Sequence, residues 1–168
     1  MGLFDMFKSD QGTTMTPHLG FITLMWAIMS SDGEIDAEEV GQLLSIIGGT
    51  DDGTGTIVIG GQARKLLEAA QKNVRIKSLP QLLKEITPLL TDAQKMCILV
   101  NMVDSSLSDG VPEAEEQAII GQVMQAFVIS EDRFRPFFEC IAFKNDRTVF
   151  TNQAHAKNVP GYMVKLPR

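Results

Sequence analysis

The chain has 168 residues, of which 44% are hydrophobic and 7% aromatic, and its formal net charge is −6. This length and apolar content suit one domain with a mostly aliphatic core, which excludes a disordered chain and a disulfide-stapled miniprotein. The negative charge argues against nucleic acid as the main partner.

The N-terminus, Met1-Gly2-Leu3-Phe4-Asp5-Met6-Phe7-Lys8, is too short and too charged for a signal peptide. No apolar run in the sequence approaches the ~18 residues of a membrane span. Leu3, Phe4 and Phe7 form either a small amphipathic contact with a membrane surface or a terminal turn docked on the domain. We therefore expect a cytoplasmic protein, with peripheral membrane association as one option.

The first predicted helix begins at Thr16-Pro17, because threonine caps helices and proline suits the first helical position. Apolar residues then recur as in a largely buried helix. Asp32-Gly33 ends that helix in a turn. Asp36 caps a second helix, and Glu39, three residues later, completes a capping box.

Residues 48–61 form a glycine-rich loop, with six glycines among fourteen residues, at which the second helix should end. A phosphate-binding loop needs a lysine and a hydroxyl after its last glycine, whereas Gly61 leads to Gln62-Ala63. We therefore interpret the segment as a flexible linker. Residues 62–90 resume helical periodicity in two helices that carry mostly basic charge.

Thr91 and Gln94 form another capping box, which opens a helix through Val103, and a further helix follows to about Phe127. Ser130 caps a last helix, in which Pro136 favours a bend or an early end. From about Lys144 the periodicity is lost. The sequence predicts an all-α fold of about seven helices, with residues 16–48 and 91–129 as related halves of a domain spanning 1–143. Residues 144–168 form an irregular extension, in which residues 147–150 could make a short strand.

The relation between the halves rests on an acidic phrase that occurs twice. Ser31-Asp32-Gly33-Glu34-Ile35-Asp36-Ala37-Glu38-Glu39 returns 77 positions later as Ser108-Asp109-Gly110-Val111-Pro112-Glu113-Ala114-Glu115-Glu116, with six of nine residues identical. We name residues 31–39 the first acidic loop and residues 108–116 the second acidic loop. A constant offset with matching flanks predicts two related helix–loop–helix units.

The carboxylates of the two acidic loops are the candidate ligands of a metal ion. Neither loop fits the EF-hand template, because Ile28 or Ser105 stands at its first position. Calcium and magnesium bind six or more hard oxygens, so a site would need both loops. Its candidate ligands are Asp32, Asp36, Glu39, Asp109, Glu113 and Glu116. The alternative is that the acids at the helix starts serve only as caps and dipole partners.

The two loops, with Ser30-Ser31-Asp32-Gly33 and Leu107-Ser108-Asp109-Gly110, resemble the paired signature of TerB-like tellurite-resistance proteins. The start of the chain and Gln125-Ala126-Phe127-Val128-Ile129-Ser130-Glu131-Asp132-Arg133-Phe134 are also similar to that family. The resemblance implies a duplicated helical bundle acting in a bacterial stress response to tellurite. It further implies divalent metal binding at the acidic positions and work among other proteins of a complex at the inner membrane face.

Enzyme chemistry has little support in this sequence. His18 and His155 have no visible catalytic partner, and both are expected to be solvated. Cys97 and Cys140 lie among apolar residues, which predicts two buried, reduced thiols. Two functions remain: a metal-responsive module, with calcium or magnesium favoured, and a metal-free scaffold that holds partner proteins through separate acidic and basic faces. The charge runs supply those faces, since residues 9–63 hold eight acids and no Lys or Arg.

Overall fold

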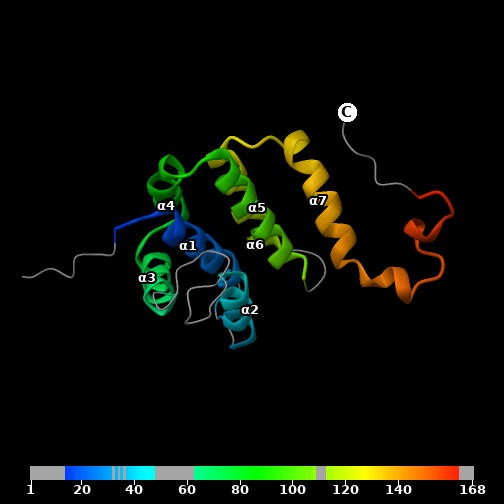
Figure 1. Ribbon diagram of the computed structural model, residues 1–168, viewed down its shortest axis with the longest axis horizontal. Helices are drawn as coiled ribbons and strands as arrows, with labels where there is room; N and C mark the ends of the chain where they lie inside the picture. The colour runs from blue at the N-terminus through cyan, green and yellow to red at the C-terminus, as the bar shows by residue number, and fades with distance from the viewer. Residues whose placement is uncertain are drawn as a thin grey trace, which may run out of the picture.

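Helices make up the regular structure of the chain (Figure 1). The structure is a computed structural model that describes residues 14–31, 33, 35, 37–47, 63–108 and 113–162. Within these ranges there are seven α-helices and no strand: α1 (Pro17–Met29), α2 (Ala37–Ile47), α3 (Ala63–Ile76), α4 (Leu79–Ile86), α5 (Asp92–Ser106), α6 (Ala114–Phe127) and α7 (Glu131–Asn145). Three short 3₁₀ helices complete the elements: η3 (Thr87–Leu89), η4 (Arg147–Phe150) and η5 (Ala156–Asn158). The all-α prediction is confirmed, while the expected N-terminal contact and the glycine-rich loop lie outside the described residues.

Three helix starts use the predicted caps. The Thr16 hydroxyl accepts a hydrogen bond from the Leu19 N–H at 3.2 Å, and Pro17 occupies the first position of α1. Thr91 and Gln94 bond each other's backbone N–H groups at the start of α5, at 3.2 and 2.9 Å. At the start of α7, the Ser130 hydroxyl accepts a hydrogen bond from the Arg133 N–H at 3.3 Å. These bonds satisfy N–H groups that have no partner within a helix, so local sequence fixes where each helix begins.

Helix α1 is the centre of the bundle. Leu19, Ile22, Leu24 and Met25 are fully buried, because α1 packs against α2, α3, α4, α5 and α6. At Gly20 of α1, an added Cβ would lie 2.8 Å from the Cγ2 atom of buried Ile86 in α4. Glycine at this position therefore lets α4 come close to α1.

Helices α6 and α7 both pack against α5 and are joined by a short turn at residues 128–130. Val128 adopts a left-handed conformation there, with φ of 57°, while the Ile129 N–H bonds the Met124 carbonyl. This is a Schellman ending, in which glycine is the usual residue. At the other end of α7, Lys144 and Asn145 each donate a hydrogen bond to Asp104 of α5 at 2.8 Å.

Two expectations from the sequence were wrong, and a third was wrong in one of its alternatives. Residues 147–150 form the 3₁₀ helix η4 rather than a strand, because local bonds such as Thr151 N–H to the Thr148 carbonyl close a turn there. Of the two effects expected of Pro136, an early end does not occur, because the last helix continues to Asn145, while a bend stays a prediction. Cys97 and Cys140 are exposed, not buried. Apolar neighbours in sequence did not predict their burial, since each helical residue is rotated ~100° from the last and can face the other way.

Candidate functional site

The helices that flank the two acidic loops have matching bounds. Helix α1 ends at Met29 and α5 at Ser106, while α2 begins at Ala37 and α6 at Ala114. Both pairs of positions differ by 77, the offset of the sequence repeat. The repeat in sequence is therefore also a repeat in structure.

The turns that lead into the two loops are also built alike. The Ser30 N–H bonds the Trp26 carbonyl at 3.0 Å, and the equivalent Leu107 N–H bonds the Val103 carbonyl at the same distance. The next bond matches too: Ser31 N–H to the Ile28 carbonyl and Ser108 N–H to the Ser105 carbonyl are both 3.2 Å. The chain therefore leaves α1 and α5 through turns that have the same hydrogen bonds.

The two halves meet through their equivalent first helices, since α1 packs against α5. Ile22 and Leu99 are fully buried at equivalent positions, as are Met25 and Met102, the next pair along the same faces. Such packing of equivalent helices is what a pseudo-symmetric pair of units requires. The second helices, α2 and α6, each follow an acidic loop.

The predicted metal ligands fall partly within the described residues. Asp32, Asp36 and Asp109 lie outside them, and Glu39 lies in α2 with its side chain outside them. Glu113 and Glu116 are described and stand at the N-cap and third positions of α6. The Glu116 carboxylate accepts a hydrogen bond from the Glu113 N–H at 2.8 Å. This pair therefore forms the capping box that the sequence predicts for the first loop.

The described donors fit a metal ion only in part. Capping uses one oxygen of Glu116 and leaves its other oxygen free to bind a cation, and carboxylate oxygens are the donors that calcium and magnesium prefer. Among the residues that the structure describes, no three His, Cys, Asp or Glu side chains gather as ligands. A complete site would need the four predicted ligands whose side chains lie outside the described residues.

Residues 146–158 hold a different polar cluster, which the sequence did not predict. The Asp146 carboxylate accepts hydrogen bonds from Lys157 Nζ at 2.7 Å and from the Thr148 hydroxyl, and His155 Nε2 lies 3.3 Å from it. The hydrogen bond from Lys157, followed by that from Thr148, lowers the pKa of Asp146 to about 2. Asp146 is therefore ionised at neutral pH and anchors the extension.

The expectation that His155 is a solvated residue without a partner was wrong. Its Nε2 faces Asp146, and its Nδ1 accepts a hydrogen bond from the Lys157 N–H at 3.1 Å. With both ring nitrogens engaged, His155 has none left to serve as a general base. The cluster therefore holds the turns of residues 146–158 together and does not form a catalytic pair. No spacing rule predicts it, because its members come from turns with no regular period.

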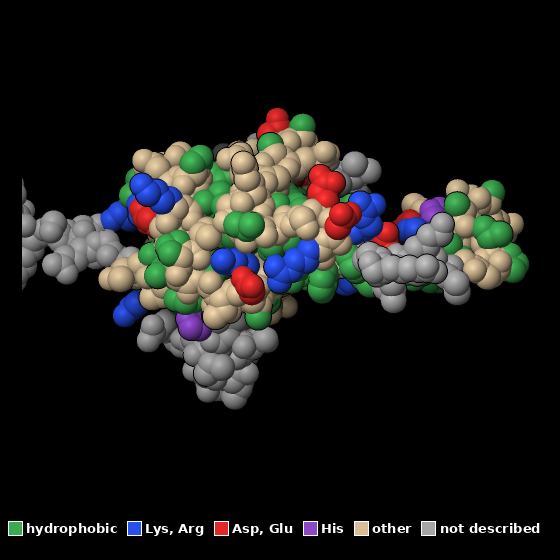
Figure 2. Space-filling model, turned by 90° about the horizontal axis from the view of Figure 1, so that it is seen from above, with side chains coloured by type: hydrophobic (Ala, Val, Ile, Leu, Met, Phe, Trp, Pro, Cys, Tyr) green, Lys and Arg blue, Asp and Glu red, His purple; other side chains and the backbone are tan. Residues whose placement is uncertain are grey.

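The described basic residues are mostly matched by nearby acids. Ion pairs join Arg64 to Glu68 and Lys77 to Glu85, in or beside α3 and α4, and Lys95 to Asp92 in α5. On the face seen in Figure 2, basic and acidic side chains are interspersed. The described part of the chain therefore offers little support for a continuous basic face.

A comparison with known protein families shows to which family the helical bundle belongs. The family model of the tellurite resistance protein TerB matches residues 18–137, from the start of α1 into α7. The chain belongs to the TerB family. The TerB match covers both acidic loops and stops before the 146–158 cluster. No curated protein and no solved structure matches the chain. Within its described residues, none of the helices has the length and apolarity to cross a membrane.

Proposed function

We propose that this TerB-family chain is a non-enzymatic stress-response module that binds a divalent cation through its paired acidic loops. The observation that carries the proposal is the structural repeat: two loops with carboxylates at four equivalent positions leave equivalent helices by the same hydrogen bonds. Capping explains the acids at the helix starts, but it does not explain why Asp-Gly recurs upstream of both. Binding of one ion by both Asp32 and Asp109 would explain that recurrence.

Ion chemistry favours a site built from both loops. Calcium takes six to eight oxygen ligands, and one loop offers too few with suitable spacing. The helix N-terminus also carries partial positive charge, which opposes a cation near Glu113 and Glu116 alone. Asp32 and Asp109, upstream of the caps, would add the negative charge that such a site needs. Calcium and magnesium are the favoured ions, and other proteins of a stress-response complex would detect the bound state.

A thermal-unfolding titration tests the proposal. Chelator-stripped protein is titrated with calcium, magnesium, manganese and zinc, beside Asp32→Asn and Asp109→Asn. An ion at a hundred times its Kd stabilises the fold by about 2.7 kcal/mol, which raises the Tm by several degrees. We expect one ion to raise the Tm with the logarithm of its concentration above the Kd, and both variants to lose that rise. Asp132→Asn is the control, since Asp132 lies outside the loops in an exposed pair with Arg135.

A second variant separates metal binding from helix capping. Glu116→Gln keeps an oxygen for the Glu113 N–H, because glutamine serves equally well in a capping box. The variant should therefore unfold like the parent in chelator, yet respond less to the ion. Flat curves for all four ions in the parent protein would overturn the metal proposal and leave a metal-free scaffold, whose partners must be sought through its charged faces.

A further inference from the structure

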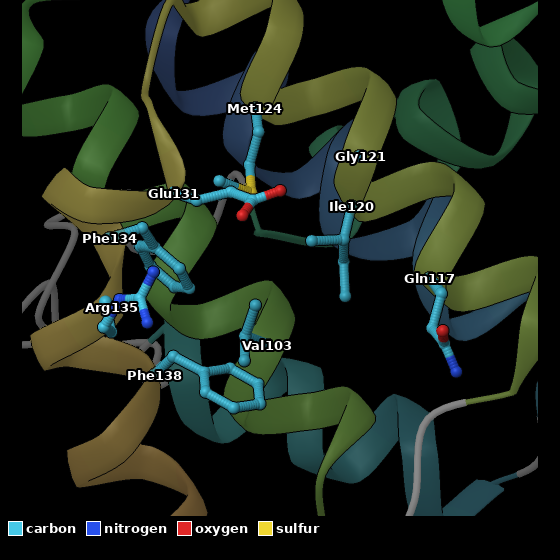
Figure 3. Close-up of a pocket in the computed structure, with 9 residues that line it drawn as sticks. All are labelled: Val103, Gln117, Ile120, Gly121, Met124, Glu131, Phe134, Arg135 and Phe138. Atoms are coloured by element: carbon cyan, nitrogen blue, oxygen red, sulfur yellow. The ribbon is translucent and has the colours of Figure 1, made fainter.

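An open apolar groove lies between α6 and α7. Its volume is about 580 Å³, and its lining includes Ile120, Gly121, Met124, Glu131, Phe134 and Arg135. Figure 3 shows the rings of Phe134 and Phe138 from α7 on one side and Ile120 and Met124 from α6 on the other. Val103 of α5 lies between the two sides. The groove is large enough for an aromatic side chain and its neighbours.

The C-terminal extension carries a projection that suits such a groove. Phe150, the last residue of η4, is 90% exposed. Arg147 stands three residues earlier, is exposed, and makes no ion pair with any described residue. In a 3₁₀ helix residues three apart lie on the same side, so η4 presents a cation and an aromatic ring together. Figure 2 shows hydrophobic side chains gathered at the tip of this extension.

The extension holds η4 in place through polar contacts. Asp146, directly before η4, binds Lys157 and Thr148, and the Asn158 side chain donates a hydrogen bond to the Val149 carbonyl at 2.7 Å. Lys157 Nζ also lies 5.3 Å from the centre of the Phe143 ring in α7. A backbone that is already fixed loses less conformational entropy when one of its side chains binds. Exposed aromatic side chains on such a backbone are typical binding anchors.

The groove of the same molecule is not within reach of η4. Its lining residues on α7 lie at 131–138, whereas η4 follows the far end of that helix. At 1.5 Å per residue, Phe134 and Asn145 are about 16 Å apart along the axis. Figure 1 shows the extension continuing past the end of α7, away from α1 to α4. A contact between the two surfaces must therefore join two molecules.

We propose that η4 of one molecule docks in the α6–α7 groove of a second copy of this chain, with Phe150 between Met124 and Phe134. Arg147 then lies beside Glu131, an exposed carboxylate at the groove that has no ion pair with a described residue. The opposite charges match, because Arg135, which also lines the groove, is already paired with Asp132 at 3.2 Å. The apolar groove is then covered. This surface is separate from the acidic loops, so it goes beyond the proposed metal binding.

Geometry favours a closed dimer over a filament. The groove lies beside the first half of α7 and η4 beyond its end, so an antiparallel pair of α7 helices places each η4 near the other molecule's groove. A two-fold axis then makes the contact twice. Two-fold dimers are the commonest soluble oligomers, because a reciprocal contact closes the assembly.

Sedimentation equilibrium of the full chain over a concentration series tests the proposal. We expect a reversible dimer whose Kd rises about tenfold or more in Phe150→Ala. Gly121→Leu should have a similar effect by filling the groove, since an added Cβ at Gly121 has no atom within 4 Å. Ile76→Ala is the control, because Ile76 is 64% exposed on α3, outside both surfaces. Circular dichroism checks that each variant is folded.

Mixing the two variants distinguishes this specific contact from non-specific association. A molecule with Phe150→Ala keeps an intact groove, and one with Gly121→Leu keeps an intact η4. The mixture should therefore associate more tightly than either variant alone. A charge swap gives a second readout: Arg147→Glu weakens the dimer, and a partner carrying Glu131→Arg restores it. A parent protein that stays monomeric at every concentration, or a dimer indifferent to both Phe150→Ala and Gly121→Leu, overturns the proposal.

Discussion

The helical bundle and the C-terminal extension are held together by different forces. In the bundle, Leu19, Ile22, Leu99 and Met102 are fully buried, and area removed from water supplies the stability. In the extension, neither η4 nor η5 has a buried residue, and charged hydrogen bonds around Asp146 fix the chain. The bundle should therefore unfold as one cooperative unit, whereas the extension should open locally without it.

The largest contrast between the regions comes from removing one apolar side chain in each. Leu99→Ala leaves a cavity at a fully buried site against α1, so we expect a loss of about 2–5 kcal/mol in the free energy of unfolding. Phe150→Ala removes a larger side chain that is 90% exposed and should change that free energy by less than about 0.5 kcal/mol. Urea unfolding at a concentration where the protein is monomeric measures both. Similar losses would show that the extension belongs to the core.

Two glycines in helices of the bundle, Gly20 at a buried contact and Gly121 on an exposed face, test how tightly the helices pack. Gly20→Ala places a Cβ 2.8 Å from buried Ile86, and such overpacking costs about 1–3 kcal/mol, less the gain of about 1 kcal/mol from better helix propensity. Gly121→Ala meets no atom within 4 Å and should stabilise the protein by up to about 1 kcal/mol. The two changes are chemically identical, so opposite signs in the same urea experiment isolate the packing effect. Equal signs would contradict the close approach of α1 and α4.

The turn between α6 and α7 offers a smaller effect. Val128 is 84% exposed and has a φ of 57°, a conformation that costs a non-glycine residue about 1–2 kcal/mol. Val128→Gly removes this strain and loses no packing, so after the entropy cost of glycine we expect a gain of under about 1 kcal/mol. Val159→Gly in the extension is the matched control, because Val159 is exposed with a φ of −73° and gains nothing. A destabilised Val128→Gly protein would show that the turn is not strained.

How far the sequence predicted the structure differs between the same two regions. In the bundle, apolar periodicity and side-chain caps such as Thr16 and Ser130 are local signals, and they placed the helices correctly. The exposure of Cys97 was missed, because periodicity gives the position of a helix more reliably than the burial of each residue at its edge.

The extension lies beyond what local signals can predict. His155 pairs with Asp146 nine positions away, and Asn158 bonds carbonyls at Val149 and Asn152, none at a regular spacing. Such contacts become visible only once the turns are known. At the candidate site, the sequence predicted the capping chemistry seen at Glu113 and Glu116, while metal binding by the acidic loops stays a prediction.

Acid should open the extension before the bundle, and this is the smallest effect on overall stability. The pKa of Asp146 is lowered from 3.8 to about 2 by Lys157 and then Thr148, so the folded extension favours the ionised carboxylate. Its contribution is complete above about pH 4 and is lost as the pH falls towards 2. Hydrogen exchange of the Asn158 amide, which bonds the His155 carbonyl at 2.8 Å, should lose protection over that range when it is measured by NMR and corrected for the intrinsic rate at each pH.

Asp146→Asn should remove that protection at neutral pH while leaving the urea midpoint of the bundle unchanged. Asp132→Asn is the matched control, because Asp132 holds only an exposed pair with Arg135 in α7. If the Asn158 amide stayed protected in Asp146→Asn, apolar contacts such as the stacking of Tyr162 on Phe143 would be holding the extension instead. A midpoint that shifted with Asp146→Asn would show that the two regions unfold together. Loss of protection in the extension alone is the result that makes it an independently held structure, able to open while the bundle stays folded.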